Sequence, residues 1–423
     1  MALIGSQYCA EKHSIDLNAS IRRIPESCTA RTLESVQARL LCAILLHAQA
    51  QSSDAAIELD KAVDLALELG LQHESFAASQ NSPLVAESCR RTWWELYTID
   101  GFFTAFHHKV IPRTSTIEAE TLLPGEDLAY EGGFPLPPTL SFPHLRRRAL
   151  LDETLFSSYA LRIEAVGVLT RVLAANDPEA TTNIDTMQGL DGFLTTWTTS
   201  LPESKTNPTT SPLSSSQPDE LLFQSLMTIQ MSTIYLHLPR AGPSSLRSQT
   251  PVVACANPSQ RFTPFLDPKS HARKASQAAK HLAALAALTS DDTERHTPFF
   301  ICALVLVAIV NLSAIAADPN REMECETMDR ISLALGLLRG EAGTWDLARG
   351  AHAQLKEIAA AAAGSAAGTG QQGVAGQGVG TALEGAEAVD FEALLAEMWW
   401  VEGACCSLPG MGEGGVAEAE AAG

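Results

Sequence analysis

The stretch that decides the fold is residues 87–109, "ESCRRTWWELYTIDGFFTAFHHK". Spaced at 3.6 residues per turn, its apolar side chains predict one long helix. Two neighbouring stripes of this helix are formed by Trp93, Leu96, Tyr97, Ile99, Phe102, Phe103 and Phe106. So many large side chains on one helix are typical of a central core element. The stretch is therefore predicted to be a buried structural helix.

Asp100 lies on the first of these stripes. An isolated carboxylate in a core is costly, so Asp100 needs a cationic or hydrogen-bonding partner. Arg90 and Arg91 lie nearly three turns away along the same helix, which places that partner on another element. The two arginines are expected to cap or bridge at the start of the helix. These residue types favour a structural role over a catalytic one.

The rest of the chain is mostly helical in pattern, and alternating strand patterns and Asn-Gly hairpins are absent. The fold class is therefore predicted to be all-α, a large multi-helix domain. Apolar periodicity predicts helices near residues 33–49, 54–69, 145–175, 187–202, 219–240, 270–288, 298–317 and 327–358.

The helix near 54–69 carries the clearest end signals. Asp54 is its predicted N-cap and Gly70 its predicted left-handed stop. Its apolar face contains Leu59, Ala62, Val63, Ala66 and Leu69. Glu58, Lys61 and Glu68 are expected on the solvated face.

Residues 110–144 are rich in proline and glycine and predict an irregular excursion, and residues 203–218 predict a disordered loop. The chain is divided into a helical domain at 1–358, an Ala/Gly-rich linker at 359–389 and a tail at 390–423.

Composition restricts the classes of function. The formal net charge is −20 and the pI is about 4.9, so most of the chain is not expected to lie on nucleic acid. The arginine run 146–148 is short for a nucleic-acid patch and is interpreted as a solvated helix start. The apolar segment 298–317 is interpreted as a buried helix, with a membrane span as the alternative.

Metal and catalytic motifs are not found in the sequence. The nine cysteines form no CxxC pair, and Cys42 and Cys302 are interpreted as small buried thiols. Their odd number, without a secretory leader, fits a reducing intracellular compartment. His107 and His108 point about 100 degrees apart on a helix and cannot share a metal ion. No catalytic, cofactor-binding or metal-binding residue is assigned, and the chain is predicted not to be an enzyme.

The segment "RRTWWELYTIDGFFTAFHHKVIPRTSTIEAETLLP" resembles the signature of the fungal-specific transcription factor domain, the middle homology region of zinc-cluster regulators. The residues that match this signature are Arg90, Arg91, Trp93, Trp94, Tyr97, Asp100, Leu123 and Pro124. Other segments fall in the order of this family, so the resemblance covers about residues 1–358. It implies an all-α regulatory domain in the nucleus that supports homo- or heterodimers with zinc-cluster regulators.

Two departures from the family pattern matter. Gly101 stands where the family usually has arginine, and "FHHK" replaces its Gly-Arg-Pro turn. The DNA-reading part of the family is a zinc cluster of six closely spaced cysteines, and Cys9 and Cys28 are 19 positions apart. This chain alone is therefore expected neither to bind zinc nor to bind DNA directly.

The first hypothesis is a fungal transcription regulator, pathway-specific for secondary metabolism or catabolism. Its candidate activation segment, for a coactivator groove, is formed by Phe391, Leu394, Leu395, Met398, Trp399 and Trp400. A final helix packed on the domain explains that segment equally well. The second hypothesis is a co-regulator that binds no DNA and dimerises with an intact zinc-cluster factor. The third, remote hypothesis is an all-α isoprenoid-type enzyme that uses Asp291 and Asp292, for which no second metal motif is found.

Overall fold

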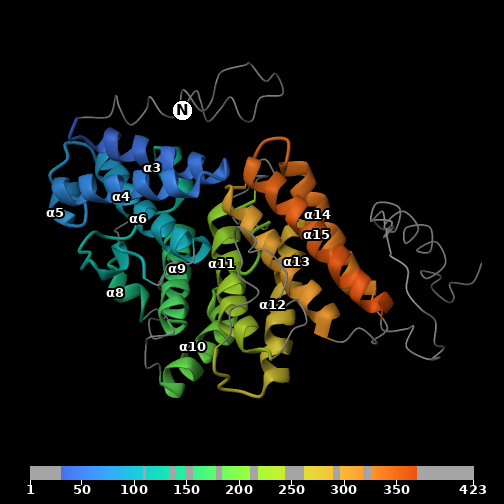
Figure 1. Cartoon of the computed structure of the whole chain (residues 1–423). Helices are drawn as coiled ribbons and strands as arrows, with labels where there is room; N and C mark the ends of the chain where they lie inside the picture. The colour runs from blue at the N-terminus through green and yellow to red at the C-terminus, as the bar shows by residue number, and fades with distance from the viewer. Residues whose placement is uncertain are drawn as a thin grey trace, which may run out of the picture. The chain divides into compact units, whose positions relative to one another are not determined.

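The computed structural model describes residues 30–107, 111–133, 140–147, 156–177, 183–209, 218–242, 262–288, 296–317 and 325–368. Every regular element within these ranges is a helix, which confirms the predicted all-α class (Figure 1). The chain clusters into two units, residues 1–362 and 363–423. The arrangement described below is that of the first unit.

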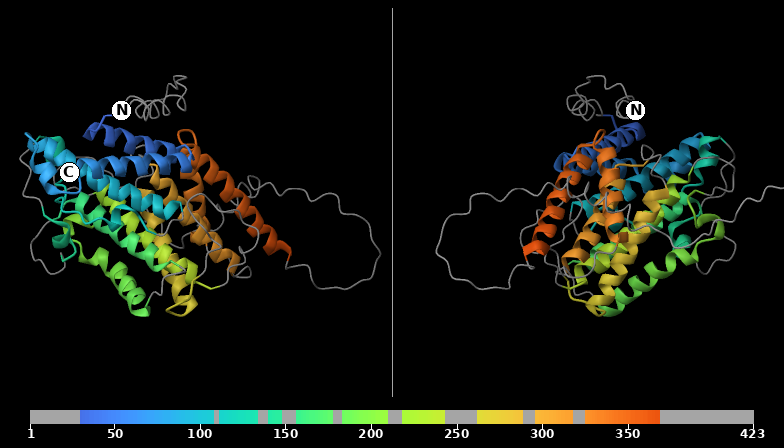
Figure 2. Two further views of the ribbon diagram at one scale, coloured as in Figure 1. Left: turned by 60° about the vertical axis from the view of Figure 1, so that its left-hand side comes forward. Right: turned by 90° about the vertical axis from the view of Figure 1, so that its right-hand side faces the viewer.

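The first helices pack around the stretch that opened the sequence analysis. They are α3 (Leu33–Ala48), α4 (Ser52–Leu69), α5 (Glu74–Ala78) and α6 (Pro83–Phe106). α3 packs against α4, and both contact α6 (Figures 1 and 2). The predicted stop at Gly70 is confirmed, because this residue ends α4 with a φ of 83° in the left-handed region that glycine adopts readily.

Two predictions for α4 are wrong. Its N-cap is Gln51, and Asp54 lies inside the first turn. Glu58, expected on the solvated face, is only 6% exposed. Its carboxylate accepts a hydrogen bond of 2.7 Å from Arg39 of α3 and another of 2.7 Å from Lys61. The packing of α3 on α4 thus covers a charge that the helical pattern placed outside.

α6 is the buried helix that the aromatic stripes predicted. Trp93, Leu96 and Phe102 are fully buried. The helix packs against α9 (Ser158–Ala175), and Gly101 faces Val166 of α9 at this contact. A Cβ atom added there would lie 2.5 Å from Cγ1 of Val166, so this crossing has room for hydrogen only.

Replacing Gly101 with alanine is expected to lower the free energy of unfolding by about 1–3 kcal/mol, as overpacking does in a dense core. Val166 is β-branched and buried, so it cannot turn away from the new methyl group. Urea denaturation of the two proteins measures the change. Gly189→Ala on α10 (Ile184–Trp197) is the control, because a Cβ there meets nothing within 4 Å. Equal effects of the two substitutions would contradict the close contact.

The remaining helices are α10 (Ile184–Trp197), α11 (Glu220–His237), α12 (Pro268–Leu288), α13 (Phe299–Ala317), α14 (Cys325–Glu341) and α15 (Asp346–Gly368). α11 lies between α9 and α12, and α13 contacts α12 and α14. Most side chains of α13 are buried by these neighbours, which supports the buried-helix interpretation. Within the described ranges, no helix was identified as long and apolar enough to cross a membrane.

Several local predictions need correction. Within the irregular excursion lie three short helices, η2 (Thr114–Thr116), α7 (Asp127–Glu131) and α8 (Phe142–Leu145). Arg146 and Arg147 are exposed, as expected, and lie in the turn that follows α8, while Arg148 lies outside the described residues. The predicted disordered loop begins with a 3-10 helix, η5 (Glu203–Lys205).

The last predicted helix is in fact two. A turn around Gly343 separates α14 from α15, because glycine is a poor helix former and Asp346 suits a new first turn. α15 then continues through the first residues of the predicted linker. An alanine run has the highest intrinsic helix propensity, which explains this extension.

The two buried thiols are confirmed at Cys42 and Cys302. Cys9, Cys28, His108, Asp291, Asp292 and the tail 390–423 lie outside the described residues.

Candidate functional site

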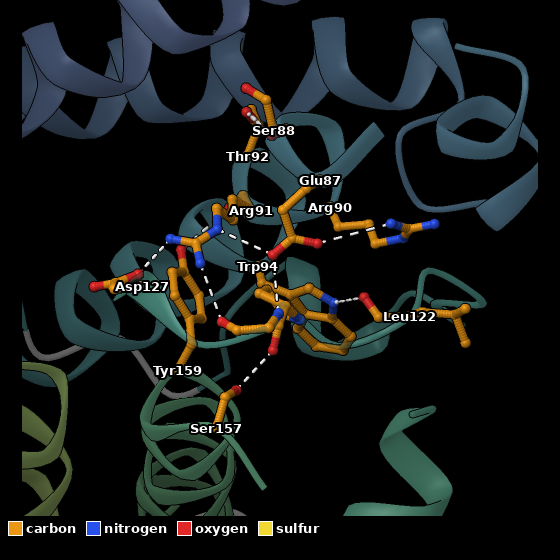
Figure 3. Close-up of polar contacts among 12 residues, drawn as sticks. Glu87, Ser88, Arg90, Arg91, Thr92, Trp94, Leu122, Asp127, Ser157 and Tyr159 are labelled. Atoms are coloured by element: carbon orange, nitrogen blue, oxygen red, sulfur yellow. Dashed lines mark hydrogen bonds and ion pairs between the residues drawn. The ribbon is translucent and has the colours of Figure 1, made fainter. Parts of the chain in front are cut away.

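The charged residues in the N-terminal half of α6 form a polar site that joins several elements (Figure 3). Arg91 donates to Oε1 of Glu87 at 3.1 Å, to Asp127, and to the carbonyl oxygen of Gly125 at 3.0 Å. Its guanidinium carbon lies 4.2 Å from the ring centre of Tyr130 and 5.1 Å from that of Tyr159. One arginine therefore joins α6, α7, α9 and the segment before α7.

Arg90, through Glu74, and Trp94 hold the same segment at Leu122, three residues before Gly125. Arg90 donates through Nε to both oxygens of Glu74 on α5, at 3.1 Å each. Glu74 also accepts the backbone N–H of Leu122 at 3.0 Å. The indole of Trp94 donates to the carbonyl oxygen of Leu122 at 2.9 Å. Glu87 accepts the N–H of Gly125 at 2.9 Å, so segment 122–127 is held along its length.

We call this set of contacts the arginine clamp, formed by Glu74, Glu87, Arg90, Arg91, Trp94, Leu122, Gly125 and Asp127. The arginines thus bridge to other elements, one of the two roles expected of them, but they lie about two turns inside α6 and not at its start, because the helix begins at Pro83. Burial by itself lowers the pKa of Arg91, but its bonds to Asp127 and Glu87 outweigh burial and leave that pKa above its ordinary value. The guanidinium therefore stays charged within the clamp.

Asp100 is held apart from the clamp. Its Oδ2 accepts the backbone N–H of Thr114 at 2.7 Å and the hydroxyl of the same residue at 2.8 Å. Thr114 belongs to η2, so the partner lies on another element, as the sequence predicted. Three further signature residues, Trp93, Tyr97 and Leu123, are core side chains, and the ring of Tyr97 packs edge-on against Trp94 at 5.5 Å.

An ion pair that the sequence analysis missed joins α6 to α9. Arg162 donates to the two oxygens of Glu95 at 2.7 and 2.8 Å, and Tyr159 donates its hydroxyl at 2.6 Å. Burial raises the pKa of Glu95, but Arg162 outweighs burial and leaves that pKa below its ordinary value. The available signal was an arginine inside the apolar run "SYALRIEAVGV".

Lysine at position 91 should loosen the clamp while keeping the charge. An ammonium group cannot hold Glu87, Asp127 and Gly125 together, nor lie flat between two rings. We expect Arg91→Lys to lower the free energy of unfolding by about 1–3 kcal/mol. Hydrogen exchange at the Gly125 amide should accelerate, with amides in α12 unchanged. Unchanged exchange at Gly125 would contradict a clamping role.

A second buried polar cluster joins α10, α11 and α12. His237 lies 2.8 Å from His271, Nδ1 to Nδ1, and its Nε2 lies 3.1 Å from Oδ1 of Asp191. The N–H of Leu266 donates to Nε2 of His271 at 3.1 Å. A backbone N–H can only donate, so Nε2 of His271 accepts; a carboxylate can only accept, so Nε2 of His237 carries a proton. Both imidazoles are therefore neutral, and each has a fixed tautomer. Nδ1–H of His271 donates to His237, and Nε2–H of His237 donates to Asp191.

We call Asp191, His237, His271 and the N–H of Leu266 the histidine chain. The pKa values of the two histidines agree with neutral rings. Burial, with the nearby His237 and Arg240, lowers the pKa of His271 to about 4. Burial also lowers the pKa of His237, against the opposing effect of Asp191. A third buried imidazole, His47, lies 3.2 Å from His107. Burial and His107 lower the pKa of His47 to about 3.

Within the part of the chain that the structure describes, no group of three or more His, Cys, Asp or Glu side chains is arranged to hold a metal ion. The clamp and the histidine chain consist of side chains engaged with one another. Their arrangement fits a role in holding the helices in place, and the clamp is the site that the signature residues form.

Comparisons with known proteins agree with this picture. Residues 1–130 match the fungal specific transcription factor domain. A protein of Pestalotiopsis fici named "C6 finger domain transcription factor iacK" is 30% identical over 331 residues, which cover 77% of this chain and 48% of that protein. The chain thus spans about half the length of this relative. Both similarities are to transcription factors, not to enzymes, and no solved structure matches.

Proposed function

We propose that this chain, whose residues 1–130 match the fungal specific transcription factor domain, acts in a fungal transcription regulator as the regulatory body, not as the DNA reader. The observation that supports this role is the arginine clamp, in which the signature residues of the domain hold α5, α6, α7 and α9 together. The net charge of −20 agrees with a body that lies away from the phosphate backbone.

The proposal extends to a pathway-specific role in the nucleus, in secondary metabolism or catabolism. Deleting the gene should change the transcripts of one group of functionally related genes, and a fluorescent fusion of the full chain should gather in the nucleus. A transcriptome identical to that of the parent strain, across growth conditions, would contradict the regulatory role. No cofactor is proposed for the helical body.

The segment at 390–400 is proposed to activate transcription. It lies outside the described residues, so the support is its sequence, in which apolar side chains alternate with Asp390, Glu392 and Glu397. The full chain, fused to a foreign DNA-binding module, should activate a reporter. The double substitution Trp399→Ala and Trp400→Ala should abolish that activity, because it removes the large apolar contacts with a coactivator groove.

Leu408→Ala is the control for this reporter experiment, since it truncates an apolar side chain of the tail outside the segment. A fusion that leaves reporter output at the level of the module alone would overturn the activation role. An equal loss of reporter activity in the Leu408→Ala variant would show that the activating residues are not confined to 390–400.

The second candidate function is that of a co-regulator, which dimerises with an intact zinc-cluster factor. The acidic composition favours it, and the resemblance to the family implies a body that supports dimers. Light scattering on the purified chain should then give the mass of a dimer, or the chain should capture a zinc-cluster factor when both are co-expressed. A monomer that captures no such factor would exclude this candidate.

A further inference from the structure

The feature that needs explanation is Arg240, at the end of η6 (Leu238–Arg240) directly after α11. Its side chain is 1% exposed, yet no carboxylate among the described residues is paired with it. By contrast, the buried side chains of Arg91 and Arg162 each have a carboxylate partner. An uncompensated buried charge is costly, and such costs are typical of functional sites.

The hydrogen bonds of Arg240 leave one side of its guanidinium without an oxygen. Nη1 donates to Oδ1 of Asn176 at 2.8 Å and to the carbonyl oxygen of Leu236 at 2.7 Å. Asn176 is itself fixed, because its Nδ2 donates to the carbonyl oxygen of Tyr235 at 2.9 Å. By contrast, Nε has no partner, and Nη2 meets only the thioether sulfur of Met187, at 3.6 Å.

Nε and Nη2 form the edge of a guanidinium that binds a carboxylate side-on, with two parallel hydrogen bonds. Two aromatic rings lie near the group, since its carbon is 5.1 Å from the ring centre of Phe262 and 5.9 Å from that of Phe265. Cation–π contact from these rings positions the group but neutralises no charge. Met187 lies against Nη2 at this edge, and its unbranched side chain can move aside.

The neighbouring charges select the kind of anion. Asp191 is engaged by Lys274 and His237, and His237 and His271 are the neutral imidazoles of the histidine chain. Among these described groups, Arg240 is the charge that has no oppositely charged partner. One positive charge in apolar surroundings matches a monoanion, whereas a phosphate dianion would need a second cation.

We propose that Arg240 is the anchor of a binding site for a small molecule with one carboxylate and an apolar body. The carboxylate binds the Nε/Nη2 edge side-on and displaces Met187, and the apolar body contacts Phe262 and Phe265. The site joins the end of α11 to α10, so binding couples these helices. The inference stands on this geometry and does not require the proposed transcriptional function.

The test measures the melting temperature of the full chain in sodium benzoate and in sodium acetate, with sodium chloride at the same ionic strength as reference. Carboxylate binding should raise the melting temperature above the chloride value by about 2 °C or more, since a ligand bound to the folded state alone stabilises it. Arg240→Lys should abolish this rise, because it keeps the charge and removes the two-nitrogen edge.

Arg91→Lys is the matched control, because it removes the same edge from an arginine that already has a carboxylate partner. That variant should keep the full rise in benzoate, whatever its own melting temperature. A second readout, benzoate binding by titration calorimetry, should show one site in the wild type and none in Arg240→Lys. Equal melting temperatures in benzoate, acetate and chloride, a rise in inorganic phosphate alone, or an undiminished rise in Arg240→Lys would each overturn the proposal.

Discussion

Arg162→Met should lower the free energy of unfolding by about 3–5 kcal/mol, the largest effect expected for a single substitution in this chain. The arginine side chain is 3% exposed and holds both oxygens of Glu95. Methionine fills a similar volume, so the loss arises from a carboxylate left without its cation between α6 and α9. Urea denaturation followed by tryptophan fluorescence measures it.

Two further variants separate the charge effect from packing. Adding Glu95→Gln to Arg162→Met removes the unpaired charge and should recover a substantial part of the lost stability. Arg171→Met, an exposed arginine of the same helix, should change the stability by no more than about 0.5 kcal/mol. If the single and double variants were equally unstable, the ion pair would not be the source of the loss.

Acidification should destabilise the protein steeply, through the buried histidines. The folded pKa values of His47 and His271, about 3 and about 4, lie below the ordinary value of 6.5. Below pH 6.5 the unfolded chain therefore binds protons that the folded chain excludes, and stability falls as the pH falls. The loss continues down to the folded pKa values. At pH 5 each of the two costs about 2 kcal/mol, at about 1.4 kcal/mol for each pH unit.

The measurement is the free energy of unfolding between pH 7 and pH 5. His271→Gln should flatten this dependence, because an amide keeps a donor and an acceptor but takes up no proton in this range. His281→Gln is the control on the same helix, since its exposed side chain contacts Gln277 and lies outside the histidine chain. If neither His271→Gln nor His281→Gln changed the dependence of stability on pH, the histidine chain would be excluded as a source of that dependence.

Local pattern was sufficient for much of the fold. The periodicity of α6, the Gly70 stop and the apolar run of α13 each predict an element that the structure contains, because side-chain spacing and backbone preference act within one helix. The errors at Asp54 and at the break between α14 and α15 concern helix ends, where several residues compete to cap the same backbone groups.

The candidate site was predictable in part. The sequence singled out Arg90, Arg91 and Asp100 and placed the partner of Asp100 on another element, because a buried charge must be satisfied. It did not identify that partner, Thr114, and it did not find the pair between Glu95 and Arg162. These contacts join residues 14 and 67 positions apart, and no local rule selects one polar residue among many at such separations.

The sequence by itself thus determined the all-α class, the central place of α6 and the burial of its charged signature, since these follow from periodicity and from the cost of burying charge. Only the tertiary structure decided which charges became paired. In the folded chain Glu58 is buried and pairs with Arg39, and Glu95 pairs with Arg162. Arg240, by contrast, has only neutral partners. The physical reason is that burial and pairing depend on which helices cross and where, and that crossing is a property of the packed chain.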